Sequence, residues 1–246
     1  MLKGFTAVYL REMLILKRRI KRQILSMSVS PLLYLIAFGY AMGDAAKFNG
    51  HTYMEFLIPG LVAMSSMTQA FAISTDINVA RFYWHIFEEF QAAPISNAAY
   101  VAGEVLAGIS RALIGVCVIL IIAFVFKIHL NYLNPLFWLA IVLNSFLFAS
   151  LATGLAMLIK SHADQAMLSS FVITPMAFLG GTFFPVTRLP VWAQKIIYLL
   201  PLTHASKIIR QTAFDNIPGS FSYFLLAVIG IVLFFTALKC VNQARD

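Results

Sequence analysis

The amino-acid sequence predicts an all-α, polytopic membrane protein with six transmembrane helices. Hydrophobic residues make up 61% of its 246 residues, and Asp, Glu, Lys and Arg together only 11%. A soluble domain of this length would need roughly a quarter of its residues charged to cover its surface. The 22 Phe residues are spread along the whole chain, so the apolar excess is not confined to one anchor. The bilayer is therefore the expected solvent for most of the surface.

The predicted spans are apolar runs close to the length of about 20 residues that a helix needs to cross the hydrocarbon core. They divide one transmembrane domain, 1–246, into a basic leader (1–22), a six-span bundle (23–238) and a short cytoplasmic tail (239–246). The spans are expected at Gln23–Met42, Met54–Thr75, Ala99–Phe126, Pro135–Ile159, Ala166–Phe184 and Phe221–Leu238.

The leader contains seven of the 18 Lys and Arg residues. Phe5, Val8, Tyr9 and Met13 recur at helical spacing, which predicts an amphipathic helix at the membrane interface. A basic cluster directly before a span sets topology and attracts anionic lipid. The net charge of +8 is therefore explained by the bilayer as partner, and no nucleic-acid partner is expected.

The basic residues also orient the predicted bundle. With the N-terminus inside, the cytoplasmic segments carry eleven Lys and Arg residues and the outer segments six. Positive residues favour the cytoplasmic side. We expect a multi-pass protein of a bacterial inner membrane with both termini in the cytoplasm.

Between spans two and three, the stretch Asp76–Asn97 has the pattern of a short amphipathic helix. Its apolar residues follow the i, i+3, i+4, i+7 rhythm of one helix face, the polar residues Arg81, His85, Glu88 and Glu89 fall mostly opposite, and Pro94 ends the element. We expect this helix at the cytoplasmic surface. Its apolar stripe comprises Val79, Phe82, Tyr83, Ile86, Phe87 and Phe90.

Between spans five and six, three prolines cut the stretch Pro185–Pro218 into two helical pieces of roughly a dozen residues. Pieces of that length are too short to span and are typical of re-entrant or interfacial segments. Trp192, Tyr198 and His204 suit an interfacial depth. We predict a re-entrant helical hairpin on the outer side.

The sequence lacks the usual signatures of catalysis and of metal binding. It has no Gly-x-x-x-x-Gly-Lys loop to hold phosphates, no His-x-x-x-His or Cys-x-x-Cys pair for a metal, and no Gly-x-Ser-x-Gly elbow. We therefore assign no catalytic residue, no metal site and no cofactor to this chain. Any energy for work must come from another subunit or from a gradient.

Two ionisable residues lie in predicted span three. A charge within the hydrocarbon costs at least about 2.5 kcal/mol and usually faces the bundle or a water-filled cavity. Glu104 and Arg111 are therefore candidates for a translocation path, although Arg111 is shallow enough to extend toward the headgroups instead. They are roughly 10 Å apart along the helix axis, too far for an unaided salt bridge.

The chain resembles the type-two ABC-transporter permeases, the membrane subunits of bacterial drug, lipid and glycan exporters. One group of motifs is Tyr53–Leu61 followed by the acidic pair Glu88–Glu89, with Pro94 and Ser96 after it. The other group comprises Thr174–Pro175, Gly180, Gly181, Pro185, Leu189–Pro190, Trp192, and Pro201 through His204. Its Pro-Leu-Thr-His ending is similar to that of nodulation-factor and daunorubicin-type export permeases.

The resemblance implies a homodimer of six-span permeases with two separate ATPase subunits, which would hold ATP and Mg²⁺. It also implies that the amphipathic helix docks on the ATPase, through the stripe residues together with Glu88 and Glu89. Besides the leader, Asp76–Asn97 is the only sizeable cytoplasmic element for such docking. The exported substrate would be a lipid, a lipid-linked glycan or a hydrophobic drug.

The alternative function is a secondary transporter or channel driven by an ion gradient. It predicts carboxylates or broken helices near the membrane midplane. Asp76, Glu104 and Asp164 all lie near span ends instead. A membrane-embedded enzyme is disfavoured by the missing motifs.

Overall fold

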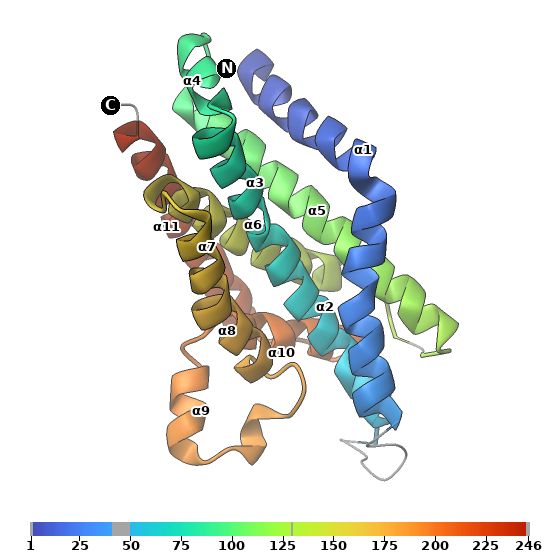
Figure 1. The fold of residues 1–246 in the computed structure, drawn as a ribbon. Coiled ribbons are helices and arrows are strands. Elements are labelled where there is room, and N and C mark those ends of the chain that lie inside the picture. Colours follow the sequence, from blue (N-terminus) through green and yellow to red (C-terminus); the bar gives the residue numbers. More distant parts are fainter. Residues whose placement is uncertain (1, 41–49, 129, 245–246) are drawn as a thin grey trace.

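The computed structural model describes residues 2–40, 50–128 and 130–244, and every regular element in these ranges is a helix (Figure 1). This confirms the all-α class. The elements are α1 (Leu2–Tyr34), η1 (Leu35–Tyr40), α2 (Tyr53–Phe71), α3 (Ile73–Asn78), η3 (Val79–Tyr83), α4 (Ile86–Ala92), α5 (Asn97–Val125), α6 (Pro135–Leu158), α7 (His162–Leu168), η4 (Ser169–Ile173), α8 (Thr174–Leu179), η5 (Val186–Arg188), α9 (Val191–Ile197), α10 (Pro201–Ala213) and α11 (Ser220–Gln243).

Within the described residues, 4 helices are long and apolar enough to cross a membrane. They are the continuous run Tyr53–Tyr83, then α5, α6 and α11. They coincide with predicted spans two, three, four and six. The predicted first span is helical up to Tyr40, with its last two residues outside the described ranges, and the predicted fifth span is helical up to Leu179. The number six stays a prediction.

The leader and the first predicted span form one helix. Instead of a break near residue 22, α1 runs without interruption from Leu2 to Tyr34 and continues into the π-helical turn η1. From residue 5 to residue 30 the sequence contains neither Gly nor Pro, the residues that most often end a helix. The change from charged to apolar side chains alters the surroundings of the helix but leaves its backbone hydrogen bonding intact.

The centre of the bundle is α2, which packs against α5, α6 and α10. Small residues permit these close approaches. A Cβ at Gly103 of α5 would lie 2.8 Å from the Val8 side chain of α1. A Cβ at Gly60 of α2 would lie 2.4 Å from the carbonyl oxygen of Thr182. A larger residue at Gly103 would force α1 away from α5, and one at Gly60 would force the turn that contains Thr182 away from α2.

Side-chain caps set the starts of several helices. Thr52 and Glu55 form a capping box at α2, and the Asn134 side chain caps α6 with Pro135 in its first turn. Ser96, part of the acidic-pair motif, accepts a hydrogen bond from the Ala99 backbone at the start of α5. That serine therefore fixes where the chain re-enters a long apolar helix.

The start of α1 and the end of α11 lie at the same end of the bundle as α4 (Figure 1). There, the Asn97 side chain donates a hydrogen bond to Asn242 near the end of α11. We call this the α4 end. The opposite end, which carries α9 and α10, is called the α10 end. Which end faces the cytoplasm remains the prediction made from the basic residues.

Candidate functional site

The structure divides the predicted amphipathic helix in two. The long helix from α2 continues through the π-helical η3 to Tyr83, and the chain then turns at Trp84 and His85. His85 has φ 54° and ψ 20°, the left-handed conformation that a helix does not accommodate. The prediction of one helix was therefore wrong, because the axis changes direction inside its stripe.

Two residues of the predicted stripe are packed inside the chain. The Phe87 ring is buried and meets the Tyr100 ring of α5 edge-on, with centroids 5.5 Å apart. Phe90 approaches the same tyrosine at 5.4 Å. Both rings therefore hold α4 against α5. Of the other stripe residues, Val79, Phe82 and Ile86 are half-buried.

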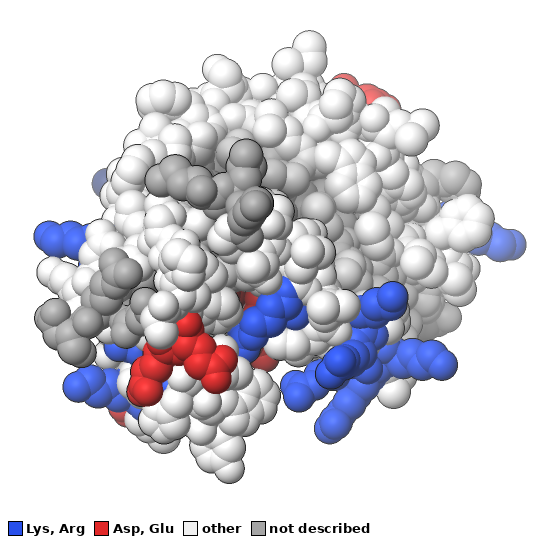
Figure 2. All heavy atoms as spheres, turned by 90° about the horizontal axis from the view of Figure 1, so that it is seen from above, with Lys and Arg blue, Asp and Glu red and all other residues white. Residues whose placement is uncertain are grey.

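The outward side chains form a different set. Tyr83 and Trp84 are exposed at 75% and 47%, and Glu88 and Glu89 also lie on the surface. We call these four residues the α4 face. Seen from this end, acidic side chains gather apart from a larger group of Lys and Arg (Figure 2). Sequence reasoning missed Trp84 because it does not fit the 3.6-residue stripe. The signal available in the sequence was a second aromatic residue directly after Tyr83, a few positions before Glu88 and Glu89.

The turn that carries the α4 face is attached to a neighbouring helix. Arg81 donates a 2.7 Å hydrogen bond to the Met157 carbonyl at the end of α6. Its guanidinium also lies 4.8 Å from the centre of the Phe82 ring and 5.1 Å from that of Phe87. Asn78 adds a hydrogen bond to the Ile159 carbonyl. Movement of this turn is thereby connected to α2, α5 and α6.

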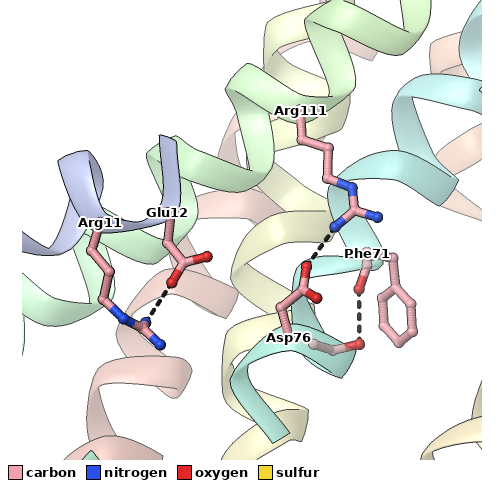
Figure 3. Close-up of polar contacts among 6 residues, drawn as sticks. Arg11, Glu12, Phe71, Asp76 and Arg111 are labelled. Carbon is pink, nitrogen blue, oxygen red and sulfur yellow. Dashed lines mark hydrogen bonds and ion pairs between the residues drawn. The ribbon is translucent and has the colours of Figure 1, made fainter. Parts of the chain in front are cut away.

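Arg111 faces the bundle and forms an ion pair with Asp76. The Arg111 Nη1 and Asp76 Oδ2 atoms are 2.5 Å apart, joining α5 to α3 (Figure 3). The two residues are 35 positions apart in the sequence, so the pairing was not visible from local spacing. Arg111 and Glu104 are not paired with each other, as the helix geometry predicted.

Glu104 is buried between α1 and α5, and its Oε2 atom has no hydrogen-bond partner among the described residues. On α1, Glu12 accepts a hydrogen bond from Arg11. Burial raises the pKa of Glu12 above its ordinary value, more than the Arg11 guanidinium lowers it. A cavity of about 20 Å³ beside Glu12 and Arg111 is large enough for about one water. Arg111 and the leader residue Glu12 therefore line the same small cavity, and a role of Glu104 and Arg111 in a translocation path stays a prediction.

At the α10 end, the predicted outer hairpin is helical. Pro185 precedes the turn η5, and Pro201 begins α10. Trp192 on α9 is exposed, and His204 bridges the Tyr198 carbonyl and the Ser222 hydroxyl. Two pieces therefore exist, although α9 has only 7 residues. Their depth in a membrane stays a prediction.

Gly180 and Gly181 form the turn that follows α8. Gly181 has φ +77°, a conformation that side chains disfavour, and its carbonyl accepts a 2.8 Å hydrogen bond from Arg210. A Cβ at Gly180 would meet the Leu202 side chain at 2.8 Å. The pair therefore brings the chain close to α10.

A cavity of about 830 Å³ opens between this turn and α10. Arg188, Lys207 and Arg210 line it together with His51, and none of the described residues in its wall is Asp or Glu. Sequence reasoning missed these cations. The signal available was the spacing of three between Lys207 and Arg210, which places both on one side of a helix.

The described residues lack the side-chain clusters that hold metal ions. Nowhere in them do three or more His, Cys, Asp or Glu side chains gather closely enough to hold an ion.

The chain is similar to known proteins over most of its length. The family model described as ABC-2 type transporter matches residues 4–214. The inner membrane transport permease YadH of Escherichia coli (strain K12) is 28% identical over 224 residues, covering 88% of this chain and 86% of YadH. Nodulation protein J of Sinorhizobium fredii (strain NBRC 101917 / NGR234) is 28% identical over 245 residues, covering 98% and 93%. Nodulation protein J of Rhizobium leguminosarum bv. viciae is 30% identical over 212 residues, covering 85% and 82%.

Proposed function

This chain belongs to the ABC-2 type transporter family, and we propose that it is the permease subunit of an ATP-driven exporter of an amphipathic substrate. Family membership makes it a membrane subunit of an ABC transporter. The similarity to an inner membrane transport permease and the apolar helices of the bundle support this role. A lipid, a lipid-linked glycan and a hydrophobic drug all fit the proposed substrate class.

The α4 face is the proposed docking surface for the ATPase subunit, and its exposed aromatic residues carry this proposal. Tyr83 and Trp84 present apolar area that the chain itself does not cover, next to the negative charges of Glu88 and Glu89. Exposed aromatics beside charged groups are typical of the energetic centres of interfaces. The predicted docking set is thus revised: Phe87 and Phe90 support the turn, and Trp84 joins the contact surface.

The connections of the α4 face explain how docking would move the bundle. The turn follows directly from the run Tyr53–Tyr83, and α4 leads through Ser96 into α5. Arg81 fastens the same turn to α6. Displacement of the face by an ATPase that closes on ATP would therefore tilt three apolar helices together.

The complete assembly would contain two copies of this chain and two ATPase subunits. ATP and Mg²⁺ would bind to the ATPase, since this sequence has no phosphate-binding loop. The α4 end would face the cytoplasm of a bacterial inner membrane, with both termini on that side. The purified chain alone should neither bind nor hydrolyse ATP.

The proposal is tested by co-purification of an ATPase subunit with the tagged chain from its native host. Trp84→Ala and the double reversal Glu88→Lys, Glu89→Lys should each lower the recovered ATPase about tenfold, as expected for an interface residue worth more than 1 kcal/mol. Trp192→Ala is the matched aromatic control, because Trp192 is also exposed, at 69% against 47% for Trp84, but lies at the α10 end. Asp164→Lys is the acidic control on α7.

Full recovery of the ATPase with all α4-face variants would reject this docking surface. ATPase activity in a preparation of the chain shown to lack a second subunit would reject the energy source. Export should stop when the phosphate-loop Lys of the partner is replaced.

One observation favours the ion-gradient alternative. Glu104 is a buried carboxylate with an oxygen that no described residue bonds, the type of group that ion-coupled transporters use. Transport in proteoliposomes that continues without ATP and collapses with a protonophore would establish it. Dependence on ATP alone would exclude it.

A further inference from the structure

We propose that the cavity at the α10 end binds a phosphate-type oxyanion attached to an organic group, such as a phosphorylated headgroup or sugar. The inference that this oxyanion is part of the exported substrate rests on the proposed function, whereas its binding to the cavity does not.

The charge of the cavity wall carries the proposal. Arg188, Lys207 and Arg210 contribute three cations, while the described wall contains no Asp or Glu. Neither Lys207 nor Arg210 forms an ion pair with a carboxylate of the described chain. Such a concentration of one sign within low-dielectric walls creates a positive potential and attracts anions. Arg and Lys are the side chains that bind phosphate oxygens most strongly.

Arg210 is held in place before any ligand arrives. Its Nη2 donates to the Gly181 carbonyl at 2.8 Å and its Nε to the Phe56 carbonyl at 3.3 Å. The guanidinium carbon also lies 3.9 Å from the centre of the Phe56 ring. Burial lowers the pKa of Arg210 to about 10, so it remains charged at neutral pH. A fixed cation loses little conformational entropy when it binds an anion.

The size of the cavity indicates more than a free inorganic ion. About 830 Å³ falls within the roughly 300–1,000 Å³ of cavities that hold small organic ligands. Its wall also includes Phe56, Val186, Tyr198 and Phe214. The cations can therefore hold the oxyanion while these apolar side chains contact the organic part.

The test uses the purified full-length chain in a neutral detergent and in nanodiscs. One arm measures equilibrium binding of labelled orthophosphate, with sn-glycerol 3-phosphate as competitor. The second arm measures retention of phosphatidylglycerol against phosphatidylcholine by native mass spectrometry. The first arm reports a free phosphate compound and the second a lipid headgroup.

Lys207→Gln and Arg188→Gln remove charge from the wall. Each should weaken binding about tenfold, the loss of one charge-assisted hydrogen bond. Lys195→Gln is the matched control, because Lys195 lies on the neighbouring helix α9 and does not line the cavity. Arg210 is left unchanged, since it also supports the fold.

Binding in either arm that both wall variants weaken, and that Lys195→Gln leaves intact, supports the proposal. Binding in neither arm, or equal weakening by all three variants, overturns it. Because no ATPase and no transport enter the measurement, failure of the proposed function would leave its result unchanged.

Discussion

The two connections that interrupt the long helices differ in how their own chain covers them. At one end, α4 is fastened through Phe87 and Phe90 to a single tyrosine, and its aromatic and acidic neighbours project outward. At the other end, α10 buries 8 of its 13 residues and packs against α2, α6 and α11. The α4 segment presents a surface, whereas α10 is part of the core.

Mutations in the α4 segment and in α10 should therefore have different effects. Changes at the buried residues of α10 should act on folding, because these side chains are packed inside the core. Changes on the α4 face should act on partners and leave folding intact. Paired variants at buried and exposed positions can test this difference between the two segments.

The largest effect is expected at Leu202 of α10. It is fully buried, so Leu202→Asp places an unpaired charge in the core, which costs several kcal/mol. Folded chain should be nearly absent when a fluorescent fusion is followed by size-exclusion chromatography. Leu199→Asp is the control, since Leu199 is 80% exposed. Equal accumulation of both variants would contradict the view of α10 as core.

A smaller effect is expected within the α4 segment. Phe87→Ala removes a buried ring and should lower the free energy of unfolding by about 3 kcal/mol. Trp84→Ala removes an exposed ring and should change it by no more than about 0.5 kcal/mol. Thermal unfolding of the two purified variants gives the comparison. If Trp84→Ala is the more destabilising, the assignment of inner and outer sides is reversed.

The smallest effect concerns the ion pair that joins α3 to α5. Asp76→Asn, Arg111→Gln and the double variant form a cycle, whose coupling free energy should lie at about 0.5–1 kcal/mol because solvent screens the pair. The pair is only partly buried, with side-chain exposures of 40% for Asp76 and 17% for Arg111. A coupling indistinguishable from zero would show that packing alone holds this part of the bundle.

Local signals in the sequence were sufficient for much of the fold. The apolar runs located the helices now seen at Tyr53–Tyr83, α5, α6 and α11, because length and hydropathy suffice to identify them. Pro201 located the start of α10, since proline suits the first turn of a helix, whereas α9 has only 7 residues and is shorter than the expected piece. The docking and path residues named from the sequence remain predictions.

What the sequence could not provide depends on backbone direction and on distant neighbours. A stripe of apolar residues counts positions around an assumed straight axis, so it could not reveal the left-handed turn at His85. The Arg111–Asp76 pair and the cation-lined cavity join residues far apart in the chain. Their assembly follows from how the helices pack, which local patterns do not specify.

The uninterrupted helix α1 has a mechanical consequence. Its 33 residues measure about 50 Å along the helix at 1.5 Å per residue, and the helix bends on its way from the basic leader toward the opposite end (Figure 1). At its far end, Tyr34 and Phe38 contact the Phe183 ring, two residues beyond the glycine whose carbonyl holds Arg210. Its most compliant points are Pro31 and the π-helical turn. A displacement of the leader would thus be carried along α1 to the edge of the cation-lined cavity at the α10 end.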